Sequence, residues 1–197
     1  MANTTHVVTG EVRLSYCNLL QPRAPLGGGE PKYSVTVLVP KNDSRTITAL
    51  RAAIEAATQA AVSKSWGGVR PPRVPDPIHD GDGVRPSDGA AFGAECKGHW
   101  VFTASSRQQP GIVDANINPI IQPTEIYSGM YGRVSVDFYG YNQAGKRGIG
   151  CGLVNVQKLR DGEPLGATRA STQDDFGVPA GTTVPTPPSG YDEALGF

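Results

Sequence analysis

The sequence has no long apolar run and only three cysteines, and each shortage excludes a class of protein. No stretch approaches the roughly 18–20 consecutive apolar residues that a membrane-spanning helix needs. Residues 1–6 lack the basic and apolar segments of a signal peptide. Cys17, Cys96 and Cys151 are odd in number and far apart, which is typical of free thiols in a reducing compartment. We therefore expect a cytosolic protein with no membrane partner.

Motifs for metal or phosphate chemistry are incomplete. Cys96 and His99 have the spacing of half a zinc site, but no second Cys/His pair completes the four ligands of a closed site. Gly140–Lys146 matches the first seven positions of a P-loop. Arg147 then stands where Ser or Thr must ligate magnesium, and the segment is expected between two strands instead of before a helix. The sequence thus predicts no zinc and no cofactor.

An acidic loop leaves one catalytic alternative open. Asp76, Asp80, Asp82 and Asp88 could hold the metal pair of a nuclease. Asp-Gly pairs, however, are turn formers first. The three histidines are scattered without a nucleophile beside them, so a hydrolytic triad has no support. We expect a protein that is not an enzyme, with a metal-dependent nuclease built on Asp76–Asp88 as the alternative.

The hydrophobic pattern indicates a mainly β fold with one helix. Residues 6–20 alternate as a strand, with Val8, Val12, Leu14 and Tyr16 on one face. Apolar residues recur near the helical period between residues 45 and 65, after a possible N-cap at residues 42–44. Further strands are expected at 32–39, 98–104, 131–139 and 146–158. We predict a small β-barrel of about five or six strands with one inserted α-helix (about 44–65).

Charge and composition divide the chain into a body and a tail. Residues 1–170 hold all 18 bases and 14 acids, a net charge of +4, whereas residues 171–197 hold four acids and no base. The tail is rich in Pro, Thr, Ser and Gly, a composition that cannot bury enough surface to fold. We predict a domain at 1–169, carrying a helix and long-loop insertion at 42–95, and a disordered acidic tail at 170–197.

Aromatic and cationic side chains gather on expected outward faces and in nearby loops. Arg133 stands two residues after Tyr131 on one strand face, and Tyr139 lies farther along it. Such a face can stack bases and hold phosphates without reading sequence, although the same residues could be ordinary cross-strand pairs. The candidate DNA-binding residues are Trp100, Arg107, Tyr127, Tyr131, Arg133, Tyr139, Tyr141, Lys146 and Arg147. At the tail tip, Asp192, Glu193 and Phe197 are candidates for binding partners.

Several segments together resemble a family of phage-encoded, OB-fold single-stranded DNA-binding proteins, long catalogued as a domain of unknown function. The resemblance covers roughly residues 6–166. The segments that carry it are Gly10-Glu-Val-Arg-Leu-Ser-Tyr16, Lys32-Tyr-Ser-Val-Thr-Val-Leu-Val-Pro40, Asp80-Gly-Asp82, Gly98-His-Trp-Val-Phe102, Ile126-Tyr-Ser-Gly-Met-Tyr-Gly-Arg133, Gly148–Gln157 and Asp161-Gly-Glu163.

The resemblance implies an OB-fold barrel that binds single-stranded DNA without catalysis during phage replication or recombination. It places the protein in the cytoplasm of the infected bacterial host. The expected partners are single-stranded DNA, duplex DNA once the tail is removed, and replication or recombination proteins that bind the tail. We expect a monomer or homodimer. A structural phage assembly protein is the second alternative.

Overall fold

The computed structural model describes residues 4–25, 28–143 and 145–166. The chain divides into a first unit, Met1–Gly166, and a second, Ala167–Phe197. The predicted tail at 170–197, with Asp192, Glu193 and Phe197, therefore lies outside the described residues. No helix in the described ranges is long and apolar enough to cross a membrane.

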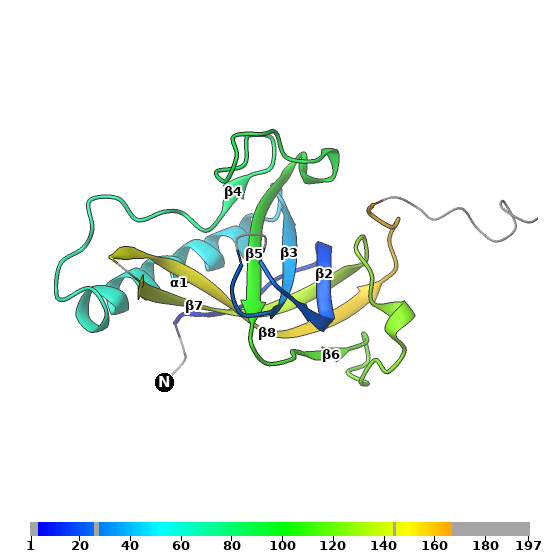
Figure 1. Cartoon of the computed structure of the whole chain (residues 1–197). Coiled ribbons are helices and arrows are strands. Elements are labelled where there is room, and N and C mark those ends of the chain that lie inside the picture. Colours follow the sequence, from blue (N-terminus) through cyan, green and yellow to red (C-terminus); the bar gives the residue numbers. More distant parts are fainter. Residues whose placement is uncertain (1–3, 26–27, 144, 167–197) are drawn as a thin grey trace, which may run out of the picture. The chain divides into compact units, whose positions relative to one another are not determined.

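Eight strands and one long helix make up the described part of the chain (Figure 1). The helix α1 (Ser44–Lys64) confirms the prediction of a helix at about 44–65. Two short 3-10 helices lie at Ala94–Cys96 and Pro123–Glu125. The strands are β1 (His6–Val8), β2 (Val12–Arg23), β3 (Lys32–Pro40), β4 (His79–Asp80), β5 (His99–Ser106), β6 (Gly111–Val113), β7 (Tyr131–Gln143) and β8 (Lys146–Arg160).

Five of these strands close into a ring within the described residues, in the order β7-β2-β3-β5-β8 and back to β7. Neighbours in the ring are antiparallel except β5 and β8, which pair in parallel. β1 pairs with β7 and β6 with β8 outside the ring, and β4 pairs with β5. This arrangement is that of an OB-like barrel, so the predicted fold class is confirmed.

The barrel interior is filled by the alternate residues that the sequence pattern marks as apolar. Val35, Val37 and Val39 of β3 are fully buried, and Phe102 and Phe138 pack with their ring centroids 6.5 Å apart. Burying each such side chain contributes about 1.5–3 kcal/mol relative to leaving it exposed. The apolar alternation of the strands therefore fixes which face turns inward.

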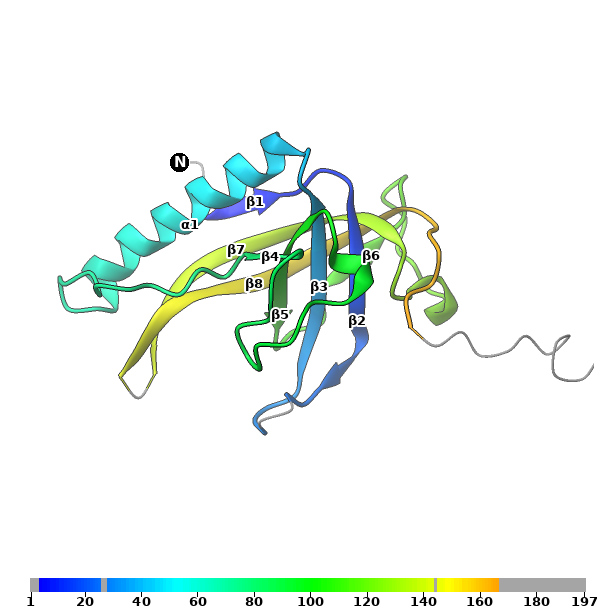
Figure 2. The same ribbon diagram turned by 90° about the horizontal axis from the view of Figure 1, so that it is seen from above.

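The helix packs against the long β7–β8 hairpin, which extends beyond the barrel alongside it (Figure 2). Asp43 caps the helix by accepting a hydrogen bond from the Thr46 amide at 3.0 Å. The buried face of the helix is lined with small residues. Ala61 therefore lies directly against Gly140, and a Cβ built on Gly140 would clash with it. Trp66, just after the helix, is buried and donates from Nε1 to the Tyr141 carbonyl at 2.9 Å.

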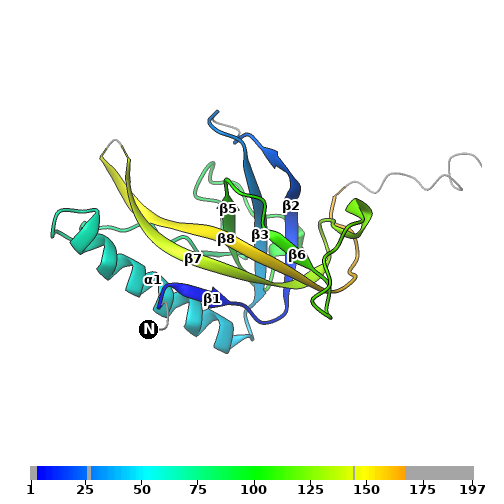
Figure 3. The same ribbon diagram turned by 90° about the horizontal axis from the view of Figure 1, so that it is seen from below.

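The expected single strand at 6–20 is wrong in two respects. The segment forms two strands instead of one. The first, β1, lies beside α1 and pairs with β7, and only β2 enters the ring (Figure 3). Val8 is consequently exposed, because Val7 takes the inward position of β1. Tyr16 was expected on the same face as Leu14, yet Leu14 is fully buried and the exposed fraction of Tyr16 is 64%. An irregular register of β2 against β3 after Ser15 interrupts the alternation there.

Candidate nucleic-acid interface

A cavity of about 660 Å³ lies on the outer face of the barrel and is called here the outer cleft. Its floor includes Thr36 of β3 and Thr103 of β5, whose hydroxyl oxygens lie 3.3 Å apart. Tyr16 contributes to it from β2 and Tyr139 from β7. The rest of the lining comes from β5, from residues 149–151 of β8 and from residues between 77 and 96, a stretch called the overhanging segment. The cleft thus joins exposed rings to a floor of small polar side chains.

The overhanging segment is held on the barrel by apolar packing and by β4. Leu38 and Val101, paired on the outer face of β3 and β5, are buried with Cys96, and Phe92 packs against them. The His79 ring stacks on Phe92 with 6.5 Å between centroids. This segment therefore covers the outer face around Leu38 and Val101, whereas the part around Thr36 and Thr103 stays open as the cleft.

Ion pairs anchor the base of the overhanging segment. Lys41 Nζ lies 2.6 Å from a carboxylate oxygen of both Asp80 and Asp82. These hydrogen bonds lower the pKa of Asp80 and of Asp82 below the ordinary value of 3.8. Asp82 also accepts from the Gly98 amide at 3.1 Å. Lys41 therefore ties the start of the segment to the end of β3.

The same contacts bear on the nuclease alternative. Each carboxylate that it needs is engaged by a base: Asp76 by Arg51, Asp80 and Asp82 by Lys41, and Asp88 by Arg85. No group of three or more His, Cys, Asp or Glu side chains converges as a metal site within the described residues. The acids of this loop act as anchors of the overhanging segment.

Two of the predicted tyrosines lie flat across the neighbouring strand. Tyr139 pairs with Gly150 and Tyr141 with Gly148. A Cβ built on Gly150 would lie 2.6 Å from Tyr139 Cζ, and one on Gly148 would lie 2.5 Å from Tyr141 Oη. The glycines of β8 therefore make room for rings on the outward face of the hairpin. Tyr139, 49% exposed, lines the outer cleft.

The other three predicted aromatics are held by intramolecular contacts. The Trp100 ring, on the same side of β5 as Phe102, has Lys41 Nζ 5.2 Å from its centroid. Tyr131 is stacked by the Arg160 guanidinium at 3.6 Å. Tyr127 binds the residues after β8 through its hydroxyl group. None of these three rings lines the outer cleft, and their contact with DNA stays a prediction.

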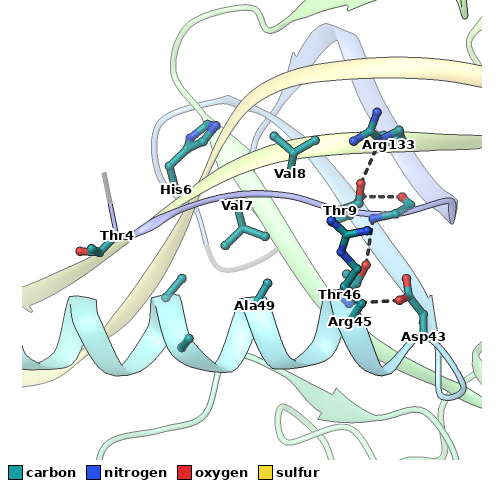
Figure 4. Close-up of a pocket in the computed structure, with 13 residues that line it drawn as sticks. Thr4, His6, Val7, Val8, Thr9, Asp43, Arg45, Thr46, Ala49 and Arg133 are labelled. Carbon is teal, nitrogen blue, oxygen red and sulfur yellow. Dashed lines mark hydrogen bonds between the residues drawn. The ribbon is translucent and has the colours of Figure 1, made fainter. Parts of the chain in front are cut away.

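The four predicted cations lie in different places. Arg107 pairs with Glu30 at 2.8 Å. Arg133 donates from Nε to the Thr9 carbonyl at 3.0 Å and lines a separate cavity of about 440 Å³ between β1 and the start of α1 (Figure 4). Lys146 pairs with Gln143 on the tyrosine face of the hairpin, whereas Arg147 pairs with Asn142 one residue along, on the opposite face. The structure thus joins only Lys146 to the face of Tyr139 and Tyr141.

Comparison with known proteins identifies the family. The family model described as "Enterobacter phage Enc34, ssDNA-binding protein" matches residues 5–184. The chain belongs to the Enc34 phage single-stranded DNA-binding protein family. The resemblance seen in the sequence is thereby confirmed, and so is the prediction that the protein is not an enzyme.

Two similar proteins accompany the family match, and a third, more distant one shares the fold. The single-stranded DNA-binding protein from bacteriophage Enc34, solved in complex with ssDNA, is 28% identical, with a TM-score of 0.69 over 83% of this chain and 90% of that one. "Putative protein p50" of Acyrthosiphon pisum secondary endosymbiont phage 1 is 29% identical over 84% of this chain and 89% of its own length. The single-stranded DNA-binding protein gp2.5 of bacteriophage T7, 16% identical with a TM-score of 0.54 over 91% of this chain and 98% of that one, shares the fold.

Sequence reasoning missed several residues of the cleft in this Enc34-family chain. Tyr16 was expected on the strand face of Leu14 with no role in binding, and His79, Arg85 and Phe92 stand in an expected loop with no predicted role. Strand alternation carries no signal for a bulge that exposes a ring. A long loop gives no indication of which sheet face it will cover. The local sequence offered only one hint, the proline- and arginine-rich character of residues 70–86.

Proposed function

We propose that this protein coats single-stranded DNA with little sequence preference, and that the strand lies in the outer cleft. The observation that carries the proposal is the exposed ring of Tyr139 beside a cleft on the outer face of β3 and β5. That face is where OB folds hold oligonucleotides. The Enc34 protein solved with ssDNA is a relative of the same family. Rings stack on any base, so binding through them needs no sequence readout.

The chemistry of the cleft favours a single strand over a duplex. Stacking on Tyr139 requires a base that is free of its neighbours, and each such stack contributes about 1–3 kcal/mol. Bases in a duplex are already stacked and paired. The floor of hydroxyl groups at Thr36 and Thr103 is sequence-tolerant, because a hydroxyl can both donate and accept. The cleft therefore suits unpaired bases of any sequence.

The cations around the cleft would hold the phosphates. Arg85 lines the cleft, and Lys146 lies at the tip of the hairpin on the tyrosine face. Arg107 is exposed after β5, paired with Glu30, which a phosphate could displace because the pair is solvent-exposed. Of the contacts predicted from sequence, we place Tyr139, Tyr141 and Lys146 nearest to the strand. Trp100, Tyr127, Tyr131, Arg133 and Arg147 would take part only if the strand extends beyond the cleft.

A salt titration tests this function. Affinity for fluorescein-labelled oligo-dT, measured by anisotropy, should fall steeply with salt, with a log–log slope of about −0.7 per phosphate contact. Lys146→Ala should make the slope shallower, whereas Tyr139→Ala should weaken binding with an unchanged slope. Affinity for oligo-dT that does not respond to salt, or that equals affinity for duplex DNA in the full-length chain, would refute the proposal.

We further propose that the acidic tail regulates the body. Residues 171–197 hold four acids and no base, whereas residues 1–170 carry a net charge of +4. A tethered anion at high effective concentration competes with DNA for a cationic surface. The tail tip, with Asp192, Glu193 and Phe197, would then bind replication or recombination proteins in the cytoplasm of the infected host. Deleting residues 171–197 should raise DNA affinity, duplex included, and weaker binding by the truncated chain would contradict this role.

Oligomeric state bears on how the protein coats DNA. We propose a monomer or homodimer. A structural assembly protein would instead form large ordered oligomers without DNA affinity. Sedimentation velocity of the free full-length chain should give a single small species. A large ordered species that does not bind oligo-dT would favour the assembly alternative.

A further inference from the structure

One wall of the outer cleft is built on a strained backbone. We propose that Tyr16 is a base-stacking residue whose left-handed backbone conformation sacrifices stability to expose its ring. Tyr16 has a φ of 47°, and its side chain is 64% exposed and lines the cleft. Non-glycine residues rarely adopt positive φ, and when they do they cluster at ligand sites. The inference rests on the proposed function, since it assigns a residue to the same cleft.

The strain arises from a β-bulge in β2. Ser15 pairs with Thr36 and Asn18 with Ser34, so β2 advances three residues while β3 advances two. The extra residue interrupts the alternation after Leu14 and turns the ring of Tyr16 outward. Without the bulge, the alternation that buries Leu14 would also bury position 16. The bulge is therefore what places the ring in the cleft.

Neighbouring side chains hold the bulge in place. Asn18 Nδ2 donates to the Tyr16 carbonyl and to Ser34 Oγ, both at 3.2 Å. The Cys17 amide donates to Ser128 Oγ at 3.2 Å. A strained residue persists only where its surroundings determine its conformation. These hydrogen bonds, whose partners include Ser34 of β3 and Ser128 before β7, hold the backbone of Tyr16 in its conformation.

Tyr16 of β2 and Tyr139 of β7 line the same cleft, whose lining also includes residues of β3, β5 and β8. Both rings are among the most exposed large apolar side chains of the described residues. An exposed ring on a strained backbone brings no packing that would offset its strain. Contact with a base in the cleft would do so, because base–aromatic stacking is available to every base.

The test replaces Tyr16 by a residue that accepts the left-handed conformation. Tyr16→Asn should weaken binding of oligo-dT by about 5- to 150-fold, the range for one lost stack. It should also raise Tm by about 2–4 °C, because asparagine tolerates positive φ. Tyr16→Phe should bind as the wild type does. On an oligonucleotide of abasic residues, Tyr16→Asn should bind as tightly as the wild type, because no base is left to stack on the ring. If Tyr16 had only a structural role, the variant would bind this oligonucleotide more weakly as well.

Ile117 provides a matched control. It has a φ of 67° and is 75% exposed, but it lies outside the outer cleft. Ile117→Asn should raise Tm in the same way and leave oligo-dT affinity unchanged. If both Asn variants weaken binding alike, the effect is not specific to the cleft and the inference is overturned. A lower Tm for Tyr16→Asn would overturn the claim of strain, and Tyr16→Gly provides a second check of it.

The outcomes separate this inference from the proposed function. If Tyr139→Ala weakens binding but Tyr16→Asn does not, the inference is wrong and the function stands. If neither variant changes the affinity of a protein that binds oligo-dT, the strand lies outside the cleft and both the placement and the inference are overturned. A wild-type protein that fails to bind oligo-dT would overturn the function itself.

Discussion

Gly150 offers a way to move the ring of Tyr139 without altering it. A Cβ at this position would lie 2.6 Å from Tyr139 Cζ and 2.8 Å from its Cε2 and Oη. Carbon atoms pack at about 3.5–4.0 Å, so the ring in Gly150→Ala must move by about 1 Å. The backbone of Gly150 is not in the left-handed region, so alanine itself is tolerated. The substitution therefore acts on the ring.

The expected effect on folding is small and the effect on binding is larger. Tyr139 is 49% exposed, so its ring can shift into solvent, and Gly→Ala stabilises a compatible site by about 0.4–1 kcal/mol through the unfolded state. Tm should therefore change by less than about 4 °C. Removing the stack altogether, as in Tyr139→Ala, should weaken binding by about 1–3 kcal/mol. Gly150→Ala should lie between this variant and the wild type.

Anisotropy titrations of labelled oligo-dT measure the affinities of four variants: Gly150→Ala, Tyr139→Ala, their double variant and Gly152→Ala. In the background of Tyr139→Ala, the Gly150→Ala change should have no further effect, because the double-mutant cycle isolates the coupling between ring and glycine. Gly152→Ala is the matched control, since its Cβ would meet Asp137 O at 3.4 Å and Tyr139 Cε1 only at 3.7 Å. Wild-type affinity for Gly150→Ala would refute the role of this ring, and so would a further loss of the same size when Gly150→Ala is added to Tyr139→Ala.

Two further predictions concern the stability of the elements that frame the cleft. Lys41 lowers the pKa values of the Asp80 and Asp82 carboxyl groups in the folded protein. The stabilising effect of the ion pairs is therefore present above the pKa that these groups have in the unfolded chain, and it is lost as pH falls through their folded-state pKa values. Lys41→Met should thus lower Tm at pH 7, and the difference from wild type should shrink below about pH 4; a pH-independent difference would contradict the ion pairs. Trp66→Phe removes the donor to the Tyr141 carbonyl and should lower the free energy of unfolding by about 1–3 kcal/mol in urea titrations, whereas an unchanged midpoint would show that the hydrogen bond adds nothing.

Sequence reasoning predicted the periodic elements well. The helix at Ser44–Lys64 follows from its apolar spacing and its Asp43 cap, and the strands β3, β5 and β7 follow from their alternation. These signals are local, because a side chain on a strand or helix has its direction set by the backbone period. The apolar face of each element was therefore readable without knowledge of its neighbours.

The candidate site could be predicted only in part. Tyr139 was predicted from its outward position on a regular strand and Tyr141 from its place on the adjoining hairpin, and their contact with DNA stays a prediction. The assumption that all outward positions of that strand form one surface failed. Tyr131 is engaged by Arg160, and Arg133 lies in the cavity beside β1, because the long strand serves several partners along its length. Lys146 and Arg147, adjacent in sequence, point to opposite faces of the hairpin.

By itself, the sequence determined the class of fold, the place of the helix and the division of charge between body and tail, because each depends on composition or on a local period. Only the tertiary structure decided where the cleft lies. Its lining joins Tyr16, Thr36, Phe92 and Tyr139, which come from three strands and one loop. Their meeting depends on ring closure of the barrel, on the fold-back of the overhanging segment and on one β-bulge. None of these leaves a periodic signal in the chain, since each is a contact between residues far apart in sequence.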